Sequence, residues 1–191
     1  GDMTGAISRC TQNPTFMEEW RKGWHPERVA PRGKSDRVLI VGGGPVGMGL
    51  AIELGQRGVR CLVVERHLQP QPIPKGQNLT QRTMEHFWSW GIEDDVRAAS
   101  PIPLEFGIGG ATAYGSLLGE YNYDWYQRAL VRSYYFKDNE RLPQYATEAA
   151  LRARAAQLPL IETLYGYSAT EVLQDETGVT VTAVGREDRQ T

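Results

Sequence analysis

The stretch Val38-Leu-Ile-Val-Gly42-Gly-Gly-Pro-Val-Gly47 decides how the middle of this chain folds. Its first four residues are apolar and mostly β-branched, which is typical of a strand covered on both faces in a parallel sheet. After the glycines, residues 48–57 have a helical pattern that Gly58 would end, and Val59 to Glu65 predicts a second strand. Strand, helix and strand in this order predict a βαβ unit with a right-handed crossover.

Each residue type in the glycine-rich stretch has a physical role in such a unit. Gly42 permits the tight turn out of the strand, and Gly44 removes a side chain that would hold a diphosphate away from the backbone. Gly47 lets the helix approach the sheet closely. Pro45 and Val46 open the helix, where a missing N–H costs nothing and where free N–H groups and the helix dipole favour phosphate.

Glu65 ends the second strand, 23 positions after Gly42. A carboxylate there can accept both hydrogen bonds of an adenosine ribose and would repel the 2′-phosphate of NADP. The pattern therefore predicts a dinucleotide that ends in ADP, although it does not separate NAD from FAD. The alternative is a glycine-rich turn with no ligand.

Three further segments extend this pattern. They are Pro74-Lys-Gly-Gln-Asn-Leu-Thr-Gln-Arg-Thr-Met-Glu85, Leu142-Pro-Gln144 and Glu148-Ala-Ala-Leu151. Together with the glycine stretch and Glu65-Arg66, they make the chain resemble the single-component FAD-dependent aromatic hydroxylases. These are the group A flavoprotein monooxygenases, which include p-hydroxybenzoate, phenol and polyketide hydroxylases. The similarity runs from about residue 37 to residue 184.

The resemblance implies an α/β fold: a Rossmann-like FAD-binding βαβ unit with a parallel sheet, an antiparallel β-meander and the start of a β-rich substrate domain. Residues 1–36 would form an N-terminal arm and residues 37–100 the first part of the FAD-binding domain. Residues 101–136 would supply substrate-domain strands, and residues 137–191 would continue the FAD-binding domain. Members of the family are about twice as long or longer, so the remaining C-terminal part, or a companion chain, is an expected partner.

The resemblance also assigns cofactor contacts. Glu65 would hold the ribose, with Arg66 near the adenine and Lys75 near the phosphates or the ribityl chain, where the family usually has arginine. Gln144 would contact the ribityl or diphosphate region. The segment expected close to the flavin consists of Gln77, Asn78 and Leu79. No catalytic side chain and no metal site are predicted.

For activity, the resemblance implies that NAD(P)H reduces FAD and that O2 then forms a flavin C4a-hydroperoxide, which hydroxylates a small aromatic, phenolic substrate. Two alternatives stay open. One is an FAD oxidoreductase of related fold with other chemistry, such as a halogenase or a reductase. The other is a nucleotide-binding fragment that is inactive without a companion chain.

Composition agrees with a small-molecule ligand. The 191 residues include 21 Lys and Arg against 23 Asp and Glu, with no basic block, so neither a nucleic acid nor a membrane is expected as a partner. Cys10 and Cys61 have no disulfide or zinc spacing, and no secretory signal is evident, which predicts a cytoplasmic protein. A homo-oligomer is left open.

Aromatic residues are dense between Tyr121 and Phe136, where seven occur among 16 residues. Such a segment could form the wall of a pocket for a planar phenolic substrate. It could equally fill an ordinary core or cover a sheet face. The three histidines have no acid or nucleophile partner in the sequence, so surface or packing roles are expected for them.

Overall fold

The computed structural model describes residues 37–101, 109–111, 122–124 and 128–185. The chain divides into Gly1–Ser35 and Asp36–Thr191, and every described residue belongs to the second unit. The predicted N-terminal arm therefore lies outside the described residues. No helix in the described ranges has the length and apolar character needed to cross a bilayer.

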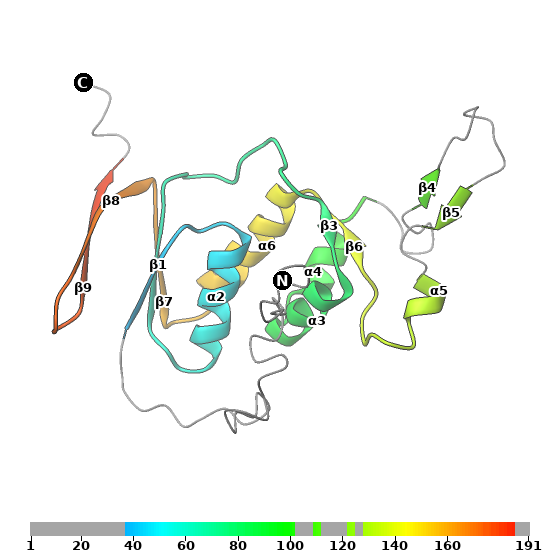
Figure 1. The fold of residues 1–191 in the computed structure, drawn as a ribbon, viewed down its shortest axis with the longest axis horizontal. Helices are drawn as coiled ribbons and strands as arrows, with labels where there is room; N and C mark the ends of the chain where they lie inside the picture. The colour runs from blue at the N-terminus through cyan, green and yellow to red at the C-terminus, as the bar shows by residue number, and fades with distance from the viewer. Residues whose placement is uncertain (1–36, 102–108, 112–121, 125–127, 186–191) are drawn as a thin grey trace, which may run out of the picture. The chain divides into compact units, whose positions relative to one another are not determined.

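A parallel three-stranded sheet organises the fold (Figure 1). Its order is β1 (Val38–Val41), β2 (Cys61–Glu65) and β7 (Ile161–Tyr165). Helix α2 (Pro45–Gln56) connects the first two strands, and α6 (Gln144–Ala156) leads into the third. The predicted βαβ unit is confirmed, and β2 lies between its two neighbours as in one half of a doubly wound sheet.

The ends of α2 depart slightly from the prediction. The helix begins at Pro45, three residues before the helical pattern of residues 48–57, because the proline ring fixes a helical φ at the first position. Gly58 follows the helix with φ +78°, in the left-handed region that favours glycine. The next strand begins at Cys61 and not at Val59, since the N–H of Val59 donates to the carbonyl of Leu54 and closes the helix end.

The sequence predicts a helix from about Thr80 to Gly91, and these two residues are the caps of helix α3 (Gln81–Trp90). Its N-cap, Thr80, accepts a hydrogen bond from the N–H of Thr83, and its C-cap, Gly91, has φ +76°. A short helix, α4 (Glu93–Ala98), follows and was not predicted.

The sequence pattern of residues 141–157 predicts a helix, but α6 begins three residues later than Arg141. Pro143 takes the N-cap position, one residue before the helix. Arg141 instead belongs to β6 (Glu140–Arg141), which pairs antiparallel with β3 (Asn78–Leu79). This pairing between residues about 60 positions apart gives no local signal in the sequence.

The sequence predicts one strand over residues 160–172, but the structure divides it in two at Gly166, which has φ +83°. After this glycine the chain leaves the parallel sheet, and β8 (Tyr167–Gln174) pairs antiparallel with β9 (Val179–Gly185). A Cβ on Gly166 would lie 2.9 Å from Cδ2 of Leu68, so both backbone conformation and space favour glycine there.

A third antiparallel pair, β4 (Gly109–Ala111) with β5 (Asn122–Asp124), and the short helix α5 (Arg128–Val131) complete the described elements. The glycine-rich residues 104–123 predict antiparallel strands, but most of them lie outside the described residues.

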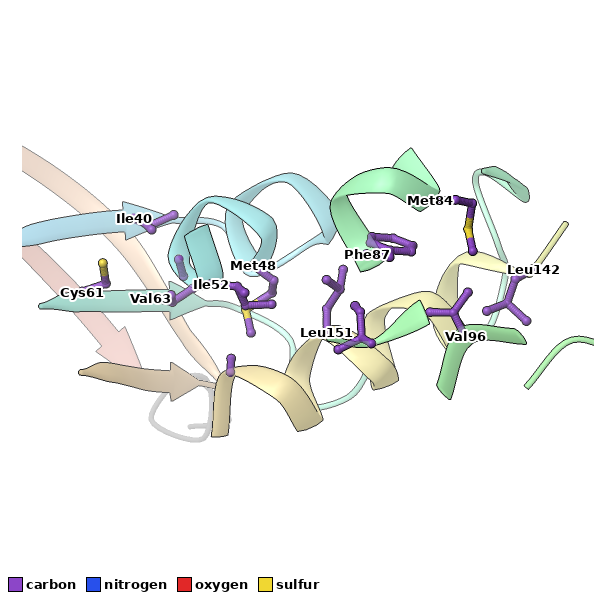
Figure 2. Packing of buried hydrophobic residues seen from close by; sticks show 13 residues of the cluster. Ile40, Met48, Ile52, Cys61, Val63, Met84, Phe87, Val96, Leu142 and Leu151 are labelled. Carbon is purple, nitrogen blue, oxygen red and sulfur yellow. The ribbon is translucent and has the colours of Figure 1, made fainter. Parts of the chain in front are cut away.

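The hydrophobic core lies between one face of the sheet and helices α2, α3, α4 and α6 (Figure 2). Met48, Ile52 and Leu151 are fully buried in it. Burial of each such side chain stabilises the fold by about 1.5–3 kcal/mol. The other face of the sheet is more exposed, with Val41 at 56% and Leu164 at 39% exposure.

Candidate functional site

The glycine loop between β1 and α2 is built by close backbone packing. Gly42 has φ +106°, which lets the chain turn sharply as it leaves the strand. A Cβ on Gly47 would overlap the carbonyl oxygen of Gly42 and would lie 3.2 Å from Cγ2 of Ile40. Gly47 therefore allows the first turn of the helix to rest against the loop and the strand.

Gly44 has the opposite environment. A Cβ at this position would meet no heavy atom within 4 Å, and φ is −73°, so neither packing nor backbone conformation requires glycine. Gly44 is the N-cap of α2 and offers no side-chain hydrogen bond to the N–H groups of the first turn. Those donors and the positive end of the helix dipole thus lie beside open space, which is an arrangement that binds phosphate.

The carboxylate of Glu65 is fixed beside this loop. Its side chain is 9% exposed, and Oε2 accepts the backbone N–H of Gly43 at 2.7 Å. Oε1 accepts the backbone N–H of His67 at 2.8 Å. A carboxylate oxygen can accept more than one hydrogen bond, so the group is oriented by the backbone and can still accept from the two hydroxyls of a ribose.

A pocket of about 490 Å³ opens over the carboxyl ends of β1 and β2. This edge of the sheet is where open α/β folds bind ligands. The predicted residues that line it are Gly42, Gly44, Glu65, Arg66, Lys75 and Gln144. We call it the polar pocket, because most of its other side chains are also polar or charged: His67, Gln69, Gln71, Glu148, Arg152 and Ser168.

A second pocket, of about 330 Å³, lies beside the first residues of α2. The predicted residues that line it are Pro45, Val46, Gln77, Asn78, Leu79 and Gln144. We call it the apolar pocket, because its walls include Phe87, Trp90 and Leu142. The Oγ1 of Thr147, also in its lining, is buried and has no hydrogen-bond partner within the described structure.

The two pockets meet at the start of α2. Gly44 lines the polar pocket, its neighbour Pro45 lines the apolar pocket, and Gln144 lines both. The site thus suits a ligand with a charged, hydroxyl-rich half and a flat apolar half. Among the predicted residues, only Gly47 lines neither pocket, and it acts by letting the loop close.

Sequence reasoning missed two charged residues of the polar pocket, both on α6. Glu148 and Arg152 follow Gln144 at intervals of four residues, so the helical period places all three on one face. The Arg152 guanidinium stacks 4.2 Å from the Tyr165 ring centroid and donates to the carbonyl oxygen of Leu68 at 2.8 Å. The helical spacing was the signal that could have identified both residues.

The predicted aromatic wall is only partly within the described residues. Tyr134, Tyr135 and Phe136 are exposed and line neither pocket. The Phe136 ring packs edge-on against Trp88, with centroids 5.1 Å apart, and Lys137 lies 5.0 Å from its centroid. The substrate-wall interpretation of the remaining aromatics concerns side chains outside the described part.

A group of buried charges holds β6 against α4. Arg97 donates to Glu93 and Glu140, each at 3.0 Å, and Lys137 lies 2.7 Å from Glu93. Burial raises the pKa of Glu93, but the hydrogen bonds from Lys137 and Arg97 outweigh burial and lower it overall. Because β6 pairs with β3, these charges fix the segment that carries Asn78 and Leu79.

No group of three or more His, Cys, Asp or Glu side chains in the described part is arranged to hold a metal ion. Cys61 is a free, buried thiol in β2, and burial raises its pKa. Neither observation assigns a reacting side chain.

The parallel sheet, the glycine loop and the carboxylate of Glu65 together define a dinucleotide-binding α/β domain. Comparison with known proteins gives the family: residues 36–191 match the FAD binding domain family, and the chain belongs to it. FAD is the cofactor of that family. The open space at Gly44, the hydroxyl of Thr147 and the paired pockets fit such a ligand.

Individual relatives are flavoprotein monooxygenases and related enzymes. The 4-methyl-5-nitrocatechol 5-monooxygenase of a Burkholderia species is 33% identical over 145 residues, which are 75% of this chain and 26% of that protein. The crystal structure of the flavin-dependent monooxygenase PieE with FAD and substrate is 28% identical, with a TM-score of 0.71. The match covers 83% of this chain and 28% of that one.

A third relative has a different activity in its name. The Diels-Alderase PyrE3 of pyrroindomycin biosynthesis has a TM-score of 0.56 and 28% identity, over 78% of this chain and 29% of that one. This chain therefore spans less than a third of the length of each of these three proteins.

Proposed function

We propose that this chain binds FAD across the two pockets. The adenosine would occupy the polar pocket with its ribose on Glu65, and the diphosphate would lie over Gly44 at the start of α2. The isoalloxazine ring would enter the apolar pocket. The observation that carries the proposal is the meeting of a polar and an apolar pocket at Gly44 and Gln144, since FAD has the same division between its two halves.

The chain's own residues would bind and orient the cofactor and exclude water from it. Glu65, already oriented by two backbone N–H groups, would accept the ribose hydroxyls without further ordering. Phe87 and Trp90 would shield one side of the ring, and the Thr147 hydroxyl would gain the partner it lacks. Bound FAD would supply the transfer of electrons from NAD(P)H to O2.

For the whole protein we propose the activity of an NAD(P)H-dependent monooxygenase that hydroxylates a small aromatic substrate. Support comes from membership of the FAD binding domain family and from the monooxygenases among the relatives. Because the chain spans only part of those relatives, further polypeptide would complete the site. The exposed apolar residues Leu39, Val41 and Leu164 on the open sheet face are a surface that such polypeptide could cover.

We also propose a cytoplasmic location, which the free thiol of Cys61 supports, because cytoplasmic proteins keep their cysteines reduced. A homo-oligomer remains part of the proposal. Size-exclusion chromatography with light scattering would measure the mass of the protein in solution and so test the oligomer.

The activity is tested in two stages. First, the purified protein should bind FAD, seen as a visible flavin spectrum that stays with the protein through gel filtration. Second, a panel of phenols should include compounds that stimulate NADH or NADPH oxidation together with O2 uptake, with one oxygen atom added to the phenol by mass spectrometry. Tight NADH binding without any flavin would contradict the cofactor assignment.

A second candidate function is FAD-dependent chemistry other than hydroxylation, which the similarity to the Diels-Alderase favours. In that case the protein would retain FAD, but no phenol would stimulate NAD(P)H oxidation. A protein that binds FAD and reacts only when mixed with another polypeptide would instead support the nucleotide-binding fragment.

A further inference from the structure

Helix α6 carries a hydrogen-bonded pair at the place where the two pockets meet. Gln144 Nε2 donates to Oε1 of Glu148 at 2.7 Å. Glu148 is only 6% exposed and lines the polar pocket, while Gln144 lines both pockets. A buried carboxylate beside a site for a diphosphate repels that anion, so its presence there calls for a compensating role.

The chemistry of the pair fixes the orientation of the amide. An ionised carboxylate can only accept hydrogen bonds, so Gln144 must turn its NH2 group toward Glu148. Its carbonyl oxygen, Oε1, then points elsewhere. That oxygen lies 3.9 Å from the position of a Cβ on Gly76, which lines the apolar pocket. Without Glu148 the amide could rotate by 180° and exchange its donor and acceptor.

The carbonyl oxygen of Gln144 can bind only a ligand group that donates a hydrogen bond. Diphosphate oxygens only accept hydrogen bonds, so they gain nothing from a carbonyl oxygen, whereas a hydroxyl can donate to it. Between its diphosphate and its ring, FAD carries the hydroxyl groups of the ribityl chain. We propose that Glu148 is a positioning residue that holds Gln144 with its carbonyl oxygen toward a ribityl hydroxyl. This inference rests on the proposed binding of FAD.

The backbone supports the same placement. The N–H of Gln144 donates to the carbonyl of Gly76 at 3.0 Å, and the N–H of Leu142 donates to the carbonyl of Gln77 at 2.8 Å. The start of α6 is therefore tied to the segment beside the apolar pocket. Glu148 lies one helical turn further on, so it acts on the ligand through Gln144 and not by reaching the junction itself.

The test compares FAD with ADP, which has the adenosine and diphosphate but no ribityl chain. Glu148→Met and Gln144→Met keep the side-chain length and remove the pair. Each should weaken FAD binding about tenfold relative to ADP binding, the usual effect of one hydrogen bond, since any change in the repulsion of the diphosphate affects both ligands alike. The double variant should be no weaker than either single variant, because both remove the same interaction.

Gln157→Met, at the other end of α6 and outside both pockets, is the matched control and should change neither affinity. Equal losses of FAD and ADP affinity in Glu148→Met would overturn the proposal, since they indicate a role in diphosphate binding or in folding. Additive losses in the double variant would also overturn it. A wild type that binds neither ligand would instead contradict the proposed FAD binding, so the two failures are distinguishable.

Glu148→Gln keeps the shape and a possible acceptor but no longer dictates the orientation of the amide. Relative to ADP binding, it should weaken FAD binding less than Glu148→Met does. A Glu148→Gln variant that loses more FAD affinity than Glu148→Met would contradict the role assigned to the carboxylate as an acceptor.

Discussion

Gly43 donates its backbone N–H to Oε2 of Glu65 at 2.7 Å, so the glycine loop and the end of the second strand hold each other in place. A Cβ on Gly43 would lie 2.8 Å from the Cβ of Glu65. The middle glycine of the loop is thus required for this contact, whereas the phosphate contact is proposed for Gly44. The backbone orients this carboxylate in the free protein, which would lower the entropy cost of the proposed ribose contact.

Glu65→Gln should weaken FAD binding by about 10- to 100-fold, because hydrogen bonds to a charged group are worth about 1.5–3 kcal/mol. The substituted amide also turns its NH2 toward a backbone N–H that needs an acceptor. Fluorescence titration with FAD measures the effect. Glu162→Gln, an exposed position on the neighbouring strand β7, is the control and should bind FAD like the wild type.

Alanine at two glycines of the loop should affect the stability of the flavin-free protein differently. Gly47→Ala places a methyl group against the Gly42 carbonyl and should destabilise the protein by about 1–3 kcal/mol, seen as a lower Tm without flavin. Gly44→Ala fills open space at a permitted φ. Without flavin, its free energy of unfolding should differ from that of the wild type by no more than about 0.5 kcal/mol.

FAD affinity separates these two variants further. Gly44→Ala should bind FAD less tightly, because its methyl group occupies the space assigned to the diphosphate. Wild-type FAD affinity in Gly44→Ala would place the phosphates elsewhere.

Thr147→Val should stabilise the flavin-free protein but weaken its binding of FAD. The buried hydroxyl has no partner in the described structure, and an unpaired buried polar group costs about 1–3 kcal/mol, so valine should raise the Tm of the flavin-free protein. In the proposed complex the hydroxyl contacts FAD, so the variant should also bind FAD more weakly. Thr170→Val, which removes a hydroxyl that donates to the carbonyl of Thr182, should lower the Tm instead.

Acid stability should depend on Glu93. Its pKa is lower in the folded protein than in the unfolded chain, so its ionised form stabilises the fold above the ordinary glutamate pKa of about 4.3. That stabilisation is lost as the pH falls through the lower folded value. Urea unfolding at a series of pH values measures the free energy of unfolding. As the pH falls, this free energy should decrease less in Glu93→Gln than in the wild type.

The control for this experiment is the exposed Glu171 on β8. Glu171→Gln should lose the same free energy of unfolding at low pH as the wild type. An identical pH dependence in Glu93→Gln and the wild type would show that the buried charges at α4 do not contribute.

The local sequence was sufficient to predict four features: the first strand, the glycine loop, helix α2 and the position of the Glu65 carboxylate. These parts interact over a few residues or through one βαβ crossover, whose geometry is nearly fixed by glycine, proline and β-branched residues. The caps of α3 were predictable for the same reason, because Thr80 and Gly91 act on the adjacent turn.

Tertiary structure decided the rest of the site. The pairing of β3 with β6 brings Asn78 beside the start of α6, and only this contact creates the apolar pocket and its junction at Gln144. Such pairing depends on the packing of distant segments, which leaves no periodic pattern in either one. The departure of β8 from the sheet at Gly166 was missed because strand-forming residues occur on both sides of this glycine, and the surrounding structure sets its φ.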